Sequence, residues 1–136
     1  MKKKKVKAII GKSKTGFTIM MEGFDLAMSY GDTLEEAKRD FEKFPQEYIE
    51  ISKETGREIP TELNNGNLEF EYVYDLSGFF AQYNFISPTK IARRMGINTS
   101  LMRQYELGGT YMSISKKRKI ENEIHTIGKE LLAVSL

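Results

Sequence analysis

Residues 87–107, SPTKIARRMGINTSLMRQYEL, decide how the rest of the chain is interpreted. Pro88 suits the first position of a helix because its φ is already fixed near the helical value, and Ser87 before it is a good N-cap. Gly96 reaches a positive φ without steric cost and ends this helix. Asn98 then caps a second helix. The spacing predicts helices over 89–95 and 99–106, joined by a tight glycine turn, which is the helix-turn-helix arrangement.

The apolar positions of this stretch have the spacing expected of two crossed helices that pack on each other. They are Ile91, Met95, Ile97, Met102 and Tyr105. Ala92 is small enough to let the two helices approach closely. The remaining positions are polar or cationic, and Asn, Gln and Arg are side chains that hydrogen-bond to base edges. The alternative is an ordinary α-hairpin whose charged face is only solvated.

We predict that this polar face binds duplex DNA. The predicted DNA-binding residues are Asn98, Thr99, Ser100, Arg103 and Gln104 on the second helix and Lys90, Arg93 and Arg94 on the first. Arg93 and Arg94 are assigned to phosphates. The stretch resembles the helix-turn-helix of the phage-repressor class (Cro and repressor), except that the loop at 108–113 lacks the proline often found there.

Composition excludes several classes of protein. The 136 residues include no cysteine, which excludes a disulfide framework and thiol chemistry. The apolar run after the lysines at 2–5 is too short for a secretory segment and is interrupted by Lys7. No run approaches the roughly 18 apolar residues of a membrane span. We therefore expect a cytoplasmic protein that contacts no membrane.

Charge is distributed unevenly along the chain, although the net charge is only +2. Residues 76–136 carry nine basic and four acidic residues, a net charge of +5. Residues 8–75 carry seven basic and fifteen acidic residues, a net charge of −8. The C-terminal part thus suits DNA, and the N-terminal part suits a basic macromolecule.

The first 75 residues predict the order β-β-β-α-β. Alternating apolar residues indicate strands at 5–10, 17–22, 26–30 and 68–74, of which the first three form an antiparallel meander. Thr33 and Glu36 have the spacing of a capping box at the start of an amphipathic helix. Pro45 predicts a kink or a break near Phe44. A polar connection, 56–67, leads to the last strand.

Two further helices are predicted beside the helix-turn-helix. The first covers 77–83 and buries Phe79 and Phe80, and the last is capped by Ser115. The apolar stripe of the last helix is Ile120, Ile124, Ile127, Leu131 and Val134. Its basic start at 116–119 opposes the helix macrodipole, and either phosphate or solvent offsets this. The fold class is α+β, with a domain boundary after residue 75 and an all-α domain over 76–136.

The β-β-β-α-β order, with GDTLEEA at 31–37, resembles the HicB antitoxin family. The resemblance implies a degenerate ribonuclease-H-like N-domain (1–75) that binds a small basic ribonuclease toxin of the HicA type. It implies that the C-terminal domain (76–136) binds double-stranded operator DNA as an autorepressor. The −8 charge of residues 8–75 is compatible with a basic toxin. The alternative is a free-standing transcriptional regulator whose N-domain senses a ligand or only dimerises.

No catalytic set, metal site or cofactor is predicted. A ribonuclease H needs carboxylates that converge on two Mg²⁺ ions. Here Glu69 and Glu71 lie on the polar face of a strand, Asp25 lies in a turn, and Asp32 lies beside a helix cap. His125 is the only histidine, and with no cysteine in the chain it forms no zinc or triad set. We therefore expect no enzyme, and a nuclease is the third reading.

A dimer or higher homo-oligomer is expected. One short recognition helix reads few base pairs, and proteins of this class place two such helices on two half-sites. Both the aromatic strands and the stripe of the last helix offer a dimer surface, and the sequence does not choose between them.

Overall fold

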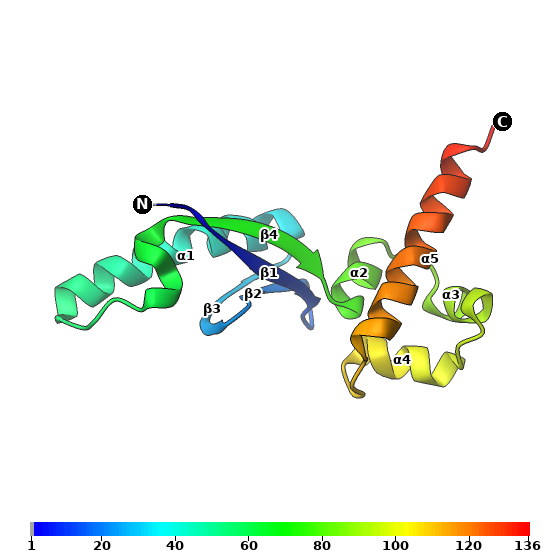
Figure 1. Cartoon of the computed structure of the whole chain (residues 1–136), viewed down its shortest axis with the longest axis horizontal. Coiled ribbons are helices and arrows are strands. Elements are labelled where there is room, and N and C mark those ends of the chain that lie inside the picture. The colour runs from blue at the N-terminus through cyan, green and yellow to red at the C-terminus, as the bar shows by residue number, and fades with distance from the viewer. Residues whose placement is uncertain (1) are drawn as a thin grey trace. The chain divides into compact units, whose positions relative to one another are not determined.

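A four-stranded sheet and several helices make up the computed structural model, which describes residues 2–136 (Figure 1). The protein is therefore of the mixed α+β class, as predicted. The strands are β1 (Lys4–Lys12), β2 (Phe17–Met21), β3 (Phe24–Gly31) and β4 (Leu68–Tyr74), and their order in the sheet is β3-β2-β1-β4. The predicted antiparallel meander of the first three strands is confirmed. β4 pairs with β1 in parallel, with Phe70 opposite Val6.

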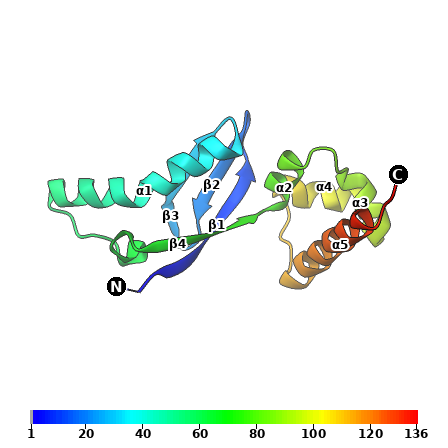
Figure 2. The ribbon, with the colours of Figure 1, turned by 90° about the horizontal axis from the view of Figure 1, so that it is seen from above.

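Helix α1 (Leu34–Thr55) covers one face of this sheet (Figure 2). The first half of its predicted capping box forms, because Thr33 Oγ1 accepts from the Glu36 amide at 3.2 Å. The Glu36 side chain returns one residue earlier than predicted, since its Oε2 accepts from the Asp32 amide at 3.2 Å. Of the kink or break predicted near Phe44, the break is absent, since α1 continues through Pro45. The kink stays a prediction. Pro45 itself is buried, so its packing offsets the backbone hydrogen bond that it cannot make.

The core of the sheet and α1 is built from alternate strand residues and the inner stripe of the helix. It includes Ala8, Ile10, Ile19, Met21, Ala37, Phe41 and Ile49. Leu63 is also fully buried, although we expected 56–67 to be only a polar connection. A short 3₁₀ helix, η1 (Thr61–Gly66), turns Leu63 inward. Within it the backbone turns tightly, and Asn64 and Asn65 adopt φ angles of 46° and 54°. Asparagine tolerates this left-handed region better than most residues.

The predicted grouping of Leu26, Met28 and Tyr30 on one face of β3 is confirmed, and that face is the outer one. Ala27 and Ser29 are the residues that point toward α1. Ser29 is buried there and its hydroxyl donates to the Ala37 carbonyl at 2.7 Å. The small inner residues allow α1 to lie close to β3.

Helix α2 (Leu76–Gln82) packs on the end of β1. A Cβ at Gly78 would lie 2.2 Å from the Ile10 carbonyl oxygen, so only glycine permits this approach. Asp75 Oδ1 accepts from the Gly78 amide and the Ser77 hydroxyl, and Ser77 Oγ accepts from the Lys12 amide at 3.0 Å. The structure divides into two compact units after Gln82, so α2 belongs to the same unit as the sheet. The predicted toxin-binding domain (1–75) and DNA-binding domain (76–136) stay predictions.

The second unit, Tyr83–Leu136, contains α3 (Pro88–Met95), α4 (Thr99–Leu107) and α5 (Ile114–Leu132). Its most buried residues are Ile91, Ala92, Met102 and Ile120. α5 begins after Ser113, whose hydroxyl accepts from the Lys116 amide at 3.1 Å; the prediction that Ser115 caps it was wrong. No helix in residues 2–136 combines the length and the apolar character needed to cross a membrane.

Candidate functional site

Helices α3 and α4 carry the polar face that was predicted to bind DNA, and the caps that position them form as expected. Ser87 Oγ accepts from the Lys90 amide at 3.2 Å, and Gly96 ends α3 with φ 68°. Asn98 Oδ1 accepts from the amides of Ser100 and Leu101 at 2.8 and 3.2 Å. Three residues therefore separate the end of α3 from the start of α4. Ile91, Ala92 and Met102 are buried in this unit.

All eight predicted DNA-binding residues are exposed. They are Lys90, Arg93, Arg94, Asn98, Thr99, Ser100, Arg103 and Gln104. Thr99 and Arg103, and likewise Ser100 and Gln104, are four positions apart on α4 and so share one side of it. The structure thus brings the predicted α4 residues together on the exposed surface of this helix.

Two of these polar side chains already use part of their hydrogen-bonding capacity. The amide oxygen of Asn98 is engaged in the cap, which leaves its amino group as a donor. Gln104 Oε1 accepts from the Thr110 hydroxyl at 2.9 Å, which also leaves the amino group. The guanidinium of Arg103 makes no hydrogen bond or ion pair with any residue in 2–136, so it is the cationic donor of α4 that is open to a ligand.

Arg94 makes ion pairs that the sequence did not predict, and its predicted phosphate contact stays a prediction. Its Nε lies 2.8 Å from Glu123 Oε1, and one terminal nitrogen lies 3.0 Å from Glu130 Oε2. The hydrogen bonds from Glu123 and then from Glu130 raise the pKa of the Arg94 guanidinium. Arg94 thus joins α3 to α5 with its charge offset by two carboxylates. Sequence reasoning missed this because the partners lie 29 and 36 positions away.

The start of α5 carries a second group of cations at 116–119. Lys117, Arg118 and Lys119 are exposed, and Lys116 is half-buried. None of the four forms an ion pair with another residue of the described chain. Positive charge at a helix N-terminus is unfavourable, and an anion bound there would offset it.

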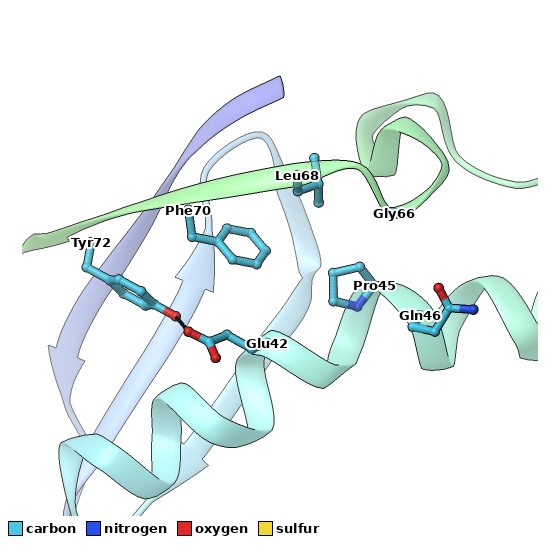
Figure 3. Close-up of a pocket in the computed structure, with 7 residues that line it drawn as sticks. All are labelled: Glu42, Pro45, Gln46, Gly66, Leu68, Phe70 and Tyr72. Atoms are coloured by element: carbon cyan, nitrogen blue, oxygen red, sulfur yellow. Dashed lines mark hydrogen bonds between the residues drawn. The ribbon is translucent and has the colours of Figure 1, made fainter. Parts of the chain in front are cut away.

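The first unit contains a cleft of about 300 Å³ between α1 and β4 (Figure 3). It is lined by Glu42, Pro45, Gln46, Gly66, Leu68, Phe70 and Tyr72. The Tyr72 hydroxyl donates to Glu42 Oε1 at 2.8 Å. Burial is the larger cause of a raised pKa of Tyr72, and this hydrogen bond is the second cause. The Lys38 amine lies 4.6 Å from the centre of the Tyr72 ring. The cleft thus combines the apolar side chains of Pro45, Leu68 and Phe70 with polar groups of Glu42, Gln46 and Tyr72. The sequence pattern did not indicate it.

The carboxylates considered for nuclease chemistry lie apart on the surface. Glu69 and Glu71 are exposed on β4, and Asp25 and Asp32 are exposed at the two ends of β3. Within residues 2–136, no three His, Cys, Asp or Glu side chains are arranged to hold a metal ion. His125 is exposed on α5.

No family model, no curated protein and no solved structure matches this chain. The resemblances to the HicB family and to the phage-repressor helix-turn-helix therefore stay predictions.

Proposed function

We propose that this protein is the antitoxin of a type II, HicAB-like toxin–antitoxin module. In this proposal the second unit binds the operator of its own operon as an autorepressor, and the first unit binds and blocks a basic ribonuclease toxin. The observation that carries the DNA-binding part is the exposed face of α4, where Thr99, Ser100 and Arg103 lie together after a capped turn.

α3 and α4 act in this proposal as a helix-turn-helix. α4 is the recognition helix, because its N-terminal residues are the small and polar ones that reach base edges in a major groove. Arg103 supplies a bidentate donor of the kind that reads guanine. The amino groups left on Asn98 and Gln104 suit acceptors on bases or phosphates.

Phosphate contacts are assigned to Lys90 and Arg93 on α3 and to the basic start of α5. These cations have no anionic partner in the described chain, in contrast to Arg94. Phosphates would neutralise the unfavourable charge at the start of α5 and would supply most of the sequence-independent affinity.

The toxin-binding part is supported by the acidic balance of residues 8–75 and by their β-β-β-α-β order, which we interpret as a degenerate ribonuclease-H-like fold. Complementary charge accelerates encounter with a basic toxin, and apolar contacts must then hold the complex. The cleft between α1 and β4 favours the alternative function, a free-standing regulator that senses a ligand.

Co-expression tests the toxin-binding part and separates the two functions. The gene beside this one would be expressed in cells with and without the full-length chain. We expect a small basic protein that arrests growth alone and is neutralised by co-expression. A neighbouring gene with no toxicity, together with specific operator binding by this chain, would favour the free-standing regulator.

A further inference from the structure

Strand β3 is the terminal strand on one side of the sheet. It extends over eight residues, Phe24–Gly31, and no strand in residues 2–136 pairs with its outer side. One row of its main-chain donors and acceptors is thus available to another strand. An edge of this kind is a ready template for pairing with a second chain.

The face of β3 that points away from α1 is apolar and uncovered. Leu26 is 64% exposed, Met28 is 38% exposed and Tyr30 is 62% exposed. Met28 also continues an apolar row across the sheet, because it pairs with Met20, Met20 pairs with Ile9, and Ile9 pairs with Val73. The edge therefore offers hydrophobic contacts as well as hydrogen bonds.

β3 lacks the features that keep sheet edges apart. Between Leu26 and Tyr30 it has no charged residue and no proline. The opposite edge, β4, carries Glu69 and Glu71, which two copies of β4 would bring near each other. Of the two edges, β3 is therefore the one that suits a second copy of this chain.

We propose that two copies of the chain pair antiparallel through β3, about a two-fold axis between the two Met28 residues. Leu26 of one copy then lies opposite Tyr30 of the other. Asp25 faces Gly31 and Asp32 faces Phe24, so no acid faces an acid at either end. The two sheets join into one, and the three apolar side chains of each copy cover those of the other. Pairing through β3 would form the dimer that we expect to bind the operator. The experiments on β3 use neither DNA nor toxin, so the dimer proposal and the proposed function can fail independently.

Cysteine cross-linking tests the contact and its register. The chain has no cysteine, so each introduced thiol is the only one. Met28→Cys should form a disulfide-linked dimer on oxidation, because Cα atoms directly opposite in an antiparallel pair are about 4.5–5.5 Å apart, within the range of a disulfide. Met20→Cys is the matched control, since its two copies lie roughly 14 Å apart, three strand spacings, and should not link. Leu26→Cys should link with Tyr30→Cys in a mixture and not with itself.

Sedimentation of the full-length chain tests the same surface without a cross-linker. The parent should be dimeric at micromolar concentration. The double variant Leu26→Glu and Tyr30→Glu places acids of the two copies opposite each other, and it should weaken dimerisation by more than about tenfold. Leu26→Lys with Tyr30→Glu places opposite charges there and should restore a dimer that dissociates with salt. Unchanged circular dichroism would show that each variant folds.

The apolar stripe of α5 is the competing dimer surface, and Leu131→Glu tests it because Leu131 is an exposed residue of that stripe. The proposal expects it to leave the dimer intact. A monomeric parent, or a dimer that Leu131→Glu dissociates while the Leu26→Glu and Tyr30→Glu pair does not, would overturn the proposal. So would a Met28→Cys variant that links no better than Met20→Cys.

Discussion

Arg94 Nε and Glu123 Oε1 lie 2.8 Å apart, and this ion pair ties α3 to α5. Its neighbour in sequence, Arg93, is exposed and has no anionic partner in residues 2–136. Two adjacent arginines that look equivalent in the sequence therefore differ in the structure. We expect them to have separate tasks: Arg94 joins two helices of the second unit through ion pairs, and Arg93 is available to a phosphate.

Replacing each arginine by alanine separates these tasks. Arg93→Ala should weaken binding to all DNA sequences alike and lower the slope of log affinity against log salt by about one, because one phosphate contact is lost. Arg94→Ala should change that slope less and should lower the melting temperature of the second unit more. Fluorescence anisotropy at several salt concentrations and thermal denaturation measure the two effects. Equal salt slopes for the two variants would contradict this division.

Arg103→Ala should remove base discrimination. We expect a loss of about 1–3 kcal/mol on the sequence selected from a random duplex library, with little loss on unrelated DNA. The reason is that Arg103 is the α4 cation without a partner in the described chain, on the same side of the helix as Thr99. Lys129→Ala, which removes an exposed cation of α5 that has no assigned DNA contact, is the control. If Arg103→Ala binds the selected site as tightly as the parent does, α4 is not the reading helix.

Gly78→Ala should destabilise the first unit by about 1–3 kcal/mol, the usual range for overpacking. A Cβ there would lie 2.2 Å from the Ile10 carbonyl oxygen, so α2 must move away from β1. Gly128→Ala is the matched control, because nothing lies near its Cβ position on α5. That change should stabilise the chain by about 1 kcal/mol through helix propensity. Urea denaturation measures both, and a neutral Gly78→Ala would show that α2 does not pack on β1 in solution.

Tyr72 should remain protonated in the folded protein at a pH where ordinary tyrosines ionise. Burial and the hydrogen bond to Glu42 raise its pKa, whereas in the unfolded chain it titrates near about 10. The folded state thus keeps a proton that the unfolded state loses. The stability from Tyr72 is complete below about pH 10 and falls as the pH rises above it.

Ultraviolet titration of the seven tyrosines measures this effect. Tyr72 should fail to ionise until the protein unfolds, and Tyr72→Phe should reduce the late component of the titration by one tyrosine. Tyr111→Phe, at an exposed tyrosine, should leave the late component unchanged. A late component of the same size in Tyr72→Phe and in the parent would contradict the raised pKa of Tyr72.

The two proposed functions should separate with the two compact units. A fragment of residues 1–82 should neutralise the toxin and lose the operator, and a fragment of 83–136 should bind operator DNA weakly because it lacks β3. The boundary follows Gln82 since α2 belongs with the sheet. Growth rescue and gel-shift experiments read the two activities. Rescue by 83–136 and not by 1–82 would contradict the division.

The features that the sequence predicted well are determined by neighbouring residues. Ser87, Gly96 and Asn98 act on the backbone within three or four positions, so the ends of α3 and α4 follow from local chemistry. The features that it missed depend on distant partners. Leu63 is buried only because α1 and the sheet surround it, and Arg94 is paired only because α5 returns beside α3.

Pro45 is a position where local chemistry alone does not determine the structure. Its local chemistry predicts an interruption, and burial against the sheet outweighs that preference. The exposed polar residues of α4 could be assigned from the sequence because periodicity separates inside from outside. The cleft between α1 and β4 could not, since its lining comes from three separate segments.

The parallel pairing of β1 with β4 sets the order in which the chain can mature during synthesis. β1 can pair with β2 as soon as β2 has left the ribosome, but its parallel partner β4 comes more than sixty residues later. The Lys12 amide likewise donates to Ser77, at a separation of 65 positions. Distant contacts of this kind slow folding, whereas α3 and α4 meet across a turn of three residues. We therefore expect the second unit to fold quickly once released, and the first to remain incomplete until β4 emerges. A nascent chain halted before β4 would leave one edge of β1 open to any strand within reach.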